Sequence, residues 1–256
     1  MKSLIKKIIH SDFGIFLRNS LNIYPLDMDV NKLENASVSD AFAWRTDNNF
    51  TTKFKYSDIL NIFYKVKDSW VEIHFYNKHN RLINTKKINK LSISNEINIT
   101  PEYLNNIKDY GTFFIYHYSN EVVNIENIIS NRCYLGYSQN ENLFSFAHGN
   151  TLARFKNISN KPSKDIDIIK TSFFKNQTYK IQKYFSGFDR NELFFTNPTS
   201  KLIEFTIDDV DYKLSKGCSR IIDISKKKVI SIQTNCLFLR PVVFSYKDEY
   251  LDVHHS

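Results

Sequence analysis

Hydrophobic and polar residues alternate with a period of two along much of the chain. The pattern is clearest in segments 71–76, 112–118 and 202–207. It is typical of half-buried strands, because successive side chains of a strand point to opposite faces of the sheet. The strands are short, polar turns separate them, and no long helices alternate with them. This organisation predicts a mainly β fold: an antiparallel β-sandwich, with an antiparallel barrel as the alternative.

The N-terminal residues follow a helical pattern instead. Leu4, Ile5, Ile8 and Ile9 share one face of a short helix predicted over residues 2–19, and lysines occupy the other face. Such a helix could lie on a membrane surface. Because the pattern is short, we favour a terminal helix that docks on the core.

Changes in these patterns suggest a division of the chain. Residues 90–99 and 213–224 are faintly similar, which makes two related sandwich domains one option; chance similarity in a chain rich in Ile and Lys is the other. The predicted parts are an N-terminal helix and linker (1–38), a first β-domain (39–130), an irregular connecting region (131–187) and a second β-domain (188–256).

The composition indicates a folded, basic protein. Hydrophobic residues make up 42% of the chain, enough to build a core, and the net charge is +8. A positive charge is compatible with an acidic partner. The basic residues are mostly Lys and are spread along the chain, and abundant Lys, Asn and Ile are typical of AT-rich genomes. We therefore attribute the charge to composition and expect no nucleic-acid partner.

Cysteine usage and hydropathy indicate the compartment. Cys133, Cys218 and Cys236 are far apart and form no CxxC motif, so neither a thiolate zinc site nor a disulfide framework is expected. No apolar run approaches the ~20 residues that cross a bilayer, so we expect no transmembrane span. A soluble protein in a reducing, cytoplasmic compartment fits these features.

No sequence motif identifies a reaction. The glycines never form a phosphate-binding loop, and the GxSxG, HExxH and EF-hand patterns are absent. Whether the protein is an enzyme stays open at this stage, and the absence of catalytic motifs favours a non-catalytic protein without a cofactor.

Histidines offer the alternative of a divalent transition metal. His117, His148 and His254, with Asp252, supply the imidazoles and carboxylate that such metals prefer. In a strand, Asp252 and His254 would share a face and His255 would point away. These residues form a site only if the fold brings them together; otherwise His117 is a core residue and the C-terminal pair belongs to a solvated tail.

A carbohydrate site is the second candidate. Trp44 could stack on a sugar while Arg45, Asp47 and Asn150 bind its hydroxyl groups. The alternation around Trp44 supports the competing interpretation, in which this side chain anchors the core.

Three short segments carry a resemblance: Ser39–Arg45, Phe146–Asn150 and Asp252–Ser256. They resemble uncharacterised bacterial β-rich proteins associated with surface-polysaccharide gene neighbourhoods. The resemblance spans about half the chain and implies a context, with no known activity or catalytic residue.

The leading hypothesis is a non-catalytic β-sandwich protein that binds a carbohydrate or a protein partner in a bacterial surface-glycan context. The first alternative is a metal-dependent enzyme that acts on a sugar or small molecule through the histidines. The second alternative is a structural assembly subunit, for which an oligomer and exposed strand edges would matter.

Overall fold

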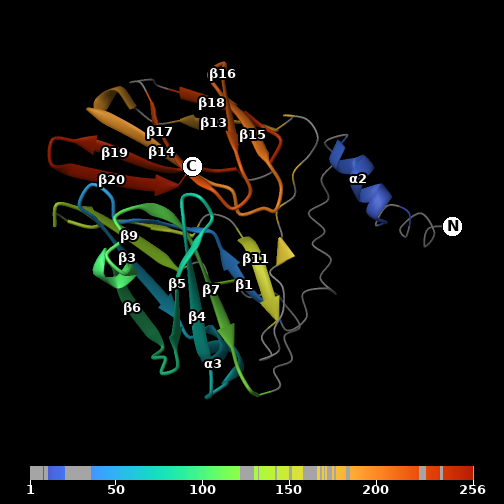
Figure 1. The fold of residues 1–256 in the computed structure, drawn as a ribbon, viewed down its shortest axis with the longest axis vertical. Coiled ribbons are helices and arrows are strands. Elements are labelled where there is room, and N and C mark those ends of the chain that lie inside the picture. Colours follow the sequence, from blue (N-terminus) through green and yellow to red (C-terminus); the bar gives the residue numbers. More distant parts are fainter. Residues whose placement is uncertain are drawn as a thin grey trace.

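The computed structural model describes most of the chain (Figure 1). Residues 1–7, 9–10 and 21–35 of the predicted N-terminal region, and Asn150 of the predicted sugar site, lie outside the described residues. The described residues are 8, 11–20, 36–121, 130–131, 133–141, 143–149, 152–157, 166–167, 169, 171, 175, 177–182, 185–224, 229–236 and 239–255.

The fold is mainly β, as the alternation predicts, and the strands of the described residues form five four-stranded sheets. We name each sheet after one of its inner strands. The β7 sheet, in the order β2-β7-β4-β5, contains Phe42–Arg45, Tyr110–Tyr118, Trp70–Asn77 and Leu82–Ile88. The β3 sheet, in the order β10-β9-β3-β6, contains Ser145–His148, Tyr134–Gln139, Phe50–Ser57 and Ser94–Ile99.

The other three sheets complete the molecule. The β1 sheet, in the order β12-β11-β1-β8, contains Ile166–Asp167, Leu152–Asn157, Ala36–Asp40 and Ser130–Asn131. The β14 sheet, in the order β17-β14-β19-β20, contains Ser219–Ile224, Arg190–Thr196, Val242–Lys247 and Tyr250–His255. The β15 sheet, in the order β13-β18-β15-β16, contains Gln177–Gln182, Val229–Thr234, Ile203–Ile207 and Val210–Leu214. Pairing is antiparallel except between β1 and β8.

Short helical segments accompany the sheets: α3 (Ile59–Tyr64), η2 (Glu102–Leu104), η3 (Phe185–Gly187) and the N-terminal α2 (Asp12–Ser20). The predicted N-terminal helix is confirmed over the range of α2. Its Phe13, Phe16 and Leu17 side chains are exposed, as is Ile8 before it. Leu4, Ile5 and Ile9 of the expected apolar face lie outside the described residues, so docking of that face on the core stays a prediction. Within the described part of the chain, no helix is long and apolar enough to cross a membrane.

Two large cores fill the space between the sheets. The first core packs Phe54 and Phe113 against Phe194 and Phe244. The second core packs Phe114 and Tyr116 together with residues of the β14 and β15 sheets. Each core therefore contains residues from both predicted β-domains, 39–130 and 188–256. The boundaries between the predicted domains are not tested by this packing and stay predictions.

The cores explain why the predicted two-layer sandwich is wrong. Strand β7 buries Phe113 and Phe114 on opposite faces, and β14 does the same with Phe194 and Phe195. A two-layer sandwich leaves one face of each sheet to solvent, whereas β7 and β14 are buried on both faces. The arrangement resembles a propeller-like ring of sheets, with the β14 and β15 sheets at the top of Figure 1.

Strand β1 covers part of one edge of β7 through its side chains. The chain bends at Ala41, so that β2 pairs with the first residues of β7 while β1 pairs with β11. Beyond β2, the backbone N–H of Ile115 donates to Ser39 Oγ (3.0 Å) and that of His117 donates to Ser37 Oγ (2.7 Å). These short hydroxyl side chains satisfy buried donors of β7 that would otherwise need a neighbouring strand.

A glycine sets the spacing between β4 and β7. A Cβ atom on Gly111 would lie 2.0 Å from the carbonyl oxygen of Tyr76 and within 2.9 Å of the Asn77 backbone. Gly111→Ala should therefore force the two strands apart and lower the free energy of unfolding by about 1–3 kcal/mol. Urea denaturation measures this change. The control is Thr85→Ala, on the exposed side of β5, which should change the free energy of unfolding by no more than ~0.5 kcal/mol. Equal midpoints for both variants would contradict the close approach.

Candidate functional site

Trp44, the centre of the predicted sugar site, is a core residue. Its side chain is fully buried in the first core, and its indole N–H donates to the carbonyl oxygen of Tyr76 at 2.9 Å. A ring without an exposed face cannot stack on a sugar. The prediction that Trp44 is a binding platform is therefore wrong, and the core-anchor interpretation is confirmed.

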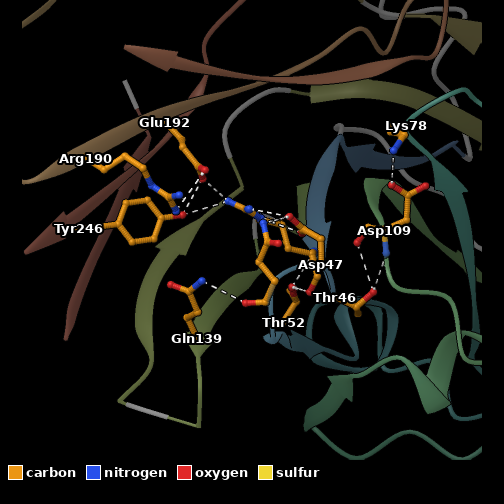
Figure 2. Close-up of polar contacts among 11 residues, drawn as sticks. Thr46, Asp47, Thr52, Lys78, Asp109, Gln139, Arg190, Glu192 and Tyr246 are labelled. Carbon is orange, nitrogen blue, oxygen red and sulfur yellow. Dashed lines mark hydrogen bonds and ion pairs between the residues drawn. The ribbon is translucent and has the colours of Figure 1, made fainter. Parts of the chain in front are cut away.

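Arg45, the next residue, forms a buried charge network with Asp47, Glu192 and Tyr246, and Figure 2 labels these three partners. Its guanidinium binds both carboxylate oxygens of Asp47 in bidentate fashion, at 3.0 and 2.7 Å. It also donates to Glu192 at 2.5 Å and to the Tyr246 hydroxyl at 3.2 Å, and Tyr246 itself donates to Glu192 at 2.6 Å. Figure 2 shows Glu192 and Tyr246 reaching this group from the β14 sheet.

Aromatic rings complete the surroundings of Arg45. The guanidinium carbon lies 4.0 Å from the ring centre of Phe50 and 4.9 Å from that of Phe244. Burial acts to lower the pKa of Arg45, but the Asp47 hydrogen bond and the neighbouring negative charges outweigh it and raise this pKa. Asp47 thus binds Arg45, and Arg45 also binds the β14 sheet, so they are structural residues rather than the predicted sugar ligands.

A smaller polar cluster beside this network fixes the turn that follows β2. Thr46 Oγ1 donates to the carbonyl oxygen of Ile107 at 2.8 Å, and its backbone N–H donates to that of Asp109 at 2.9 Å. Lys78 pairs with the Asp109 carboxylate at 3.2 Å, and this hydrogen bond raises the pKa of Lys78 (Figure 2). The cluster ties the β2–β3 turn to the start of β7.

His117 lies in the interior of the molecule. It is buried in β7, and neither ring nitrogen has a hydrogen-bond partner in the described structure. Burial lowers the pKa of His117 to about 3, which keeps the imidazole neutral. Within the described ranges, no three His, Cys, Asp or Glu residues lie close enough to hold a metal ion. The predicted metal site of His117, His148, Asp252 and His254 is therefore not formed.

Of the two C-terminal histidines, His255 lies against His148, whereas the predicted metal site used His254. Asp252 and His254 lie in β20 and share one face of it, on either side of the buried Val253, as the alternation predicts. His255 projects from the other face and meets His148 of β10, with the two Nε2 atoms 2.9 Å apart. We did not predict this pair, because it depends on two strand ends 107 residues apart in the chain.

The β3 sheet presents a group of lysine and aromatic side chains to solvent. Alternation points Phe54 and Tyr56 into the first core and Lys53 and Lys55 outward. We call the outward surface the aromatic–lysine face; it comprises Lys53, Lys55, Glu96, Tyr134, Phe144 and Phe146.

Pairing between strands places these side chains beside one another. Lys55 lies opposite Tyr134 on one side and Glu96 on the other. The ammonium of Lys53 lies 4.9 Å from the ring centre of Phe144, and that of Lys55 lies 5.2 Å from the ring centre of Phe146. Tyr134 and Phe146 are exposed. Large exposed aromatic side chains grouped with polar ones are typical of interaction surfaces.

The buried charge network yields a stability prediction. Arg45→Met removes the shorter ion pair (2.5 Å) from the buried carboxylate of Glu192 and leaves it the longer one with Arg190 (3.4 Å), so the free energy of unfolding should fall by about 3 kcal/mol. Chemical denaturation monitored by tryptophan fluorescence measures the loss. The control is Lys213→Met, which removes an exposed ion pair with Glu204 (3.0 Å) and should change stability by less than ~1 kcal/mol. A similar effect of both variants would argue against a structural role for Arg45.

His117 yields a prediction about pH. Its pKa is about 3 in the folded protein and ~6.5 in the unfolded chain, so between these values only the unfolded chain binds the proton. As the pH is lowered through this window, the free energy of unfolding should therefore decrease by up to ~1.4 kcal/mol per pH unit. His117→Leu removes this contribution, whereas the exposed control His79→Leu retains it. Urea denaturation between pH 7 and pH 4 tests this, and parallel pH profiles for wild type and His117→Leu would contradict it.

Comparison with known proteins finds no family model that matches the sequence and no curated protein that matches it. Function therefore has to be argued from the geometry and chemistry of the described residues.

Proposed function

We propose that the protein is a non-catalytic binding protein that binds an acidic glycan on the aromatic–lysine face of the β3 sheet. The observation that carries this proposal is the exposure of Tyr134 and Phe146 on neighbouring strands, next to two lysines. It keeps the carbohydrate partner expected from the sequence and moves the aromatic platform from the buried Trp44 to this sheet.

The shape of the face suits an extended chain of sugars. Phe146 packs on Gly136, where an added Cβ atom would lie 2.6 Å from the ring, so the glycine lets the ring lie close to the sheet. Four strands at ~4.8 Å spacing make a surface about 14 Å wide. Aromatic rings can cover the apolar faces of sugars while neighbouring polar groups bind their hydroxyls, the mixture usual in ligand sites.

The charges on this face favour acidic sugars. Glu96 accepts from Lys53 at 2.7 Å and pairs with Lys55 at 3.3 Å, and these contacts, led by the Lys53 hydrogen bond, lower the pKa of Glu96. One carboxylate facing two ammonium groups leaves an excess positive charge, in line with the net charge of the whole chain. Carboxylate groups of a glycan would pair with the lysines.

Binding without catalysis suits the same residues. Glycoside hydrolysis commonly uses two carboxylates that flank the scissile bond. Among the described residues that point outward from the four strands of this sheet, Glu96 is the one carboxylate, and two lysines hold it. The resemblance to proteins of surface-polysaccharide neighbourhoods implies a compatible context.

Affinity electrophoresis in gels containing polygalacturonate (acidic) or dextran (neutral) tests the proposal. The wild-type protein should be retarded by polygalacturonate. Tyr134→Ala and Phe146→Ala should each weaken this binding about tenfold, which corresponds to ~1.4 kcal/mol. Phe63→Ala, which removes an equally exposed aromatic side chain from α3, should bind as wild type does.

Two results would count against the proposal. Absence of retardation would argue against an acidic glycan partner. Unchanged binding by Tyr134→Ala and Phe146→Ala would place the glycan elsewhere on the molecule.

A further inference from the structure

His148 and His255 form a close pair at the junction of the β3 and β14 sheets. Their Nε2 atoms are 2.9 Å apart, whereas their ring centres are 4.2 Å apart and the ring planes are inclined by 57°. The nitrogens are closer together than the ring centres, so the rings converge at their Nε2 atoms. We propose that this pair binds a divalent transition-metal ion, with Cu²⁺ as the ion that it suits best.

The distance between the nitrogens favours this ion. Imidazole nitrogens lie about 2.0–2.1 Å from a bound metal. Two of them at adjacent corners of a square would therefore be ~2.9 Å apart, and at two corners of a tetrahedron ~3.3 Å apart. The observed spacing is set by the hydrogen bond of the metal-free pair and equals that of the square arrangement, which Cu²⁺ and Ni²⁺ prefer. Cu²⁺ is also the most tightly bound of the divalent first-row ions.

A backbone carbonyl oxygen fixes the tautomer of His148. His148 Nδ1 lies 3.0 Å from the carbonyl oxygen of Gly149, which can only accept, so Nδ1 carries the proton. In the neutral ring, Nε2 then presents a lone pair toward His255. A second-shell hydrogen bond of this kind fixes the tautomer and orientation of metal-binding histidines. In the metal-free pair His255 Nε2 is the donor, and it becomes a ligand when its proton moves to Nδ1.

The scaffold holds the two rings together without the metal. Pairing with β9 places His148 opposite Tyr134, and pairing with β19 places His255 opposite Val242. The two sheets are joined beside the pair, because the Val253 N–H donates to Ser145 Oγ at 2.9 Å. A metal ion bound here would replace the hydrogen bond between the two rings and would join β10 to β20 beside the Ser145–Val253 contact.

With two histidines bound to the metal, the other coordination positions are filled by oxygen atoms of water or of a bound small molecule. The inference stands on the histidine pair alone and does not depend on glycan binding at the aromatic–lysine face.

Titration of the full-length, chelator-treated protein with Cu²⁺, followed by isothermal calorimetry and electron paramagnetic resonance, tests the site. We expect one equivalent to bind and to show coupling to imidazole nitrogens. His148→Ala and His255→Ala should each weaken binding at least tenfold. His79→Ala, which removes an exposed histidine from the β4–β5 turn, should bind as wild type does.

Circular dichroism of the metal-free variants tests whether they fold. If His255→Ala does not fold, His255→Gln replaces it. Three results would overturn the inference: no binding of one equivalent to the wild type, equal affinity of the wild type and the folded variants at positions 148 and 255, or loss of binding in His79→Ala.

Discussion

The burial of both faces of strand β7 determines how the rest of the molecule is arranged. Phe113 stacks on Phe42 at 5.2 Å in the first core, while its neighbour Phe114 points into the second. Such a strand has to be covered on two sides, so a single opposing sheet cannot complete the fold. The β3 sheet and part of the β14 sheet pack on the Phe113 side, and other residues of the β14 and β15 sheets pack on the Phe114 side, which produces a ring of sheets with shared cores.

The buried network of Arg45 follows from the same constraint. Arg45 of β2 meets residues of the β14 sheet in the interior, and its ion pair with Glu192 and its hydrogen bond to Tyr246 cross between the two halves of the chain. A buried guanidinium is tolerated because Asp47, Glu192 and Tyr246 bind it and aromatic rings lie over it. What looks like a ligand site in the sequence is therefore an internal connection between sheets.

Alternation predicted the strands well and their packing poorly. The strands at 71–75 and 203–207 were identifiable because one of their faces is polar. In β7 the same alternation separates two sets of large side chains that are both buried, and no local pattern reveals how many layers cover a strand. The opposite orientations of His254 and His255 were predictable from strand geometry, whereas the approach of His148 depends on tertiary contacts. The aromatic–lysine face could have been recognised from outward positions at Lys53 and Lys55, but Tyr134 and Phe146 join it only through strand pairing.

The serine hydroxyls of β1 have a consequence for how the protein behaves at high concentration. An uncovered strand edge presents N–H groups to which another chain can add as an extra strand, the first step of many aggregates. At Ile115 and His117 these donors are already bound by Ser39 and Ser37, from a segment that belongs to a different sheet. Two small side chains thus block strand addition along this stretch of β7, and the molecule achieves this without extending the sheet.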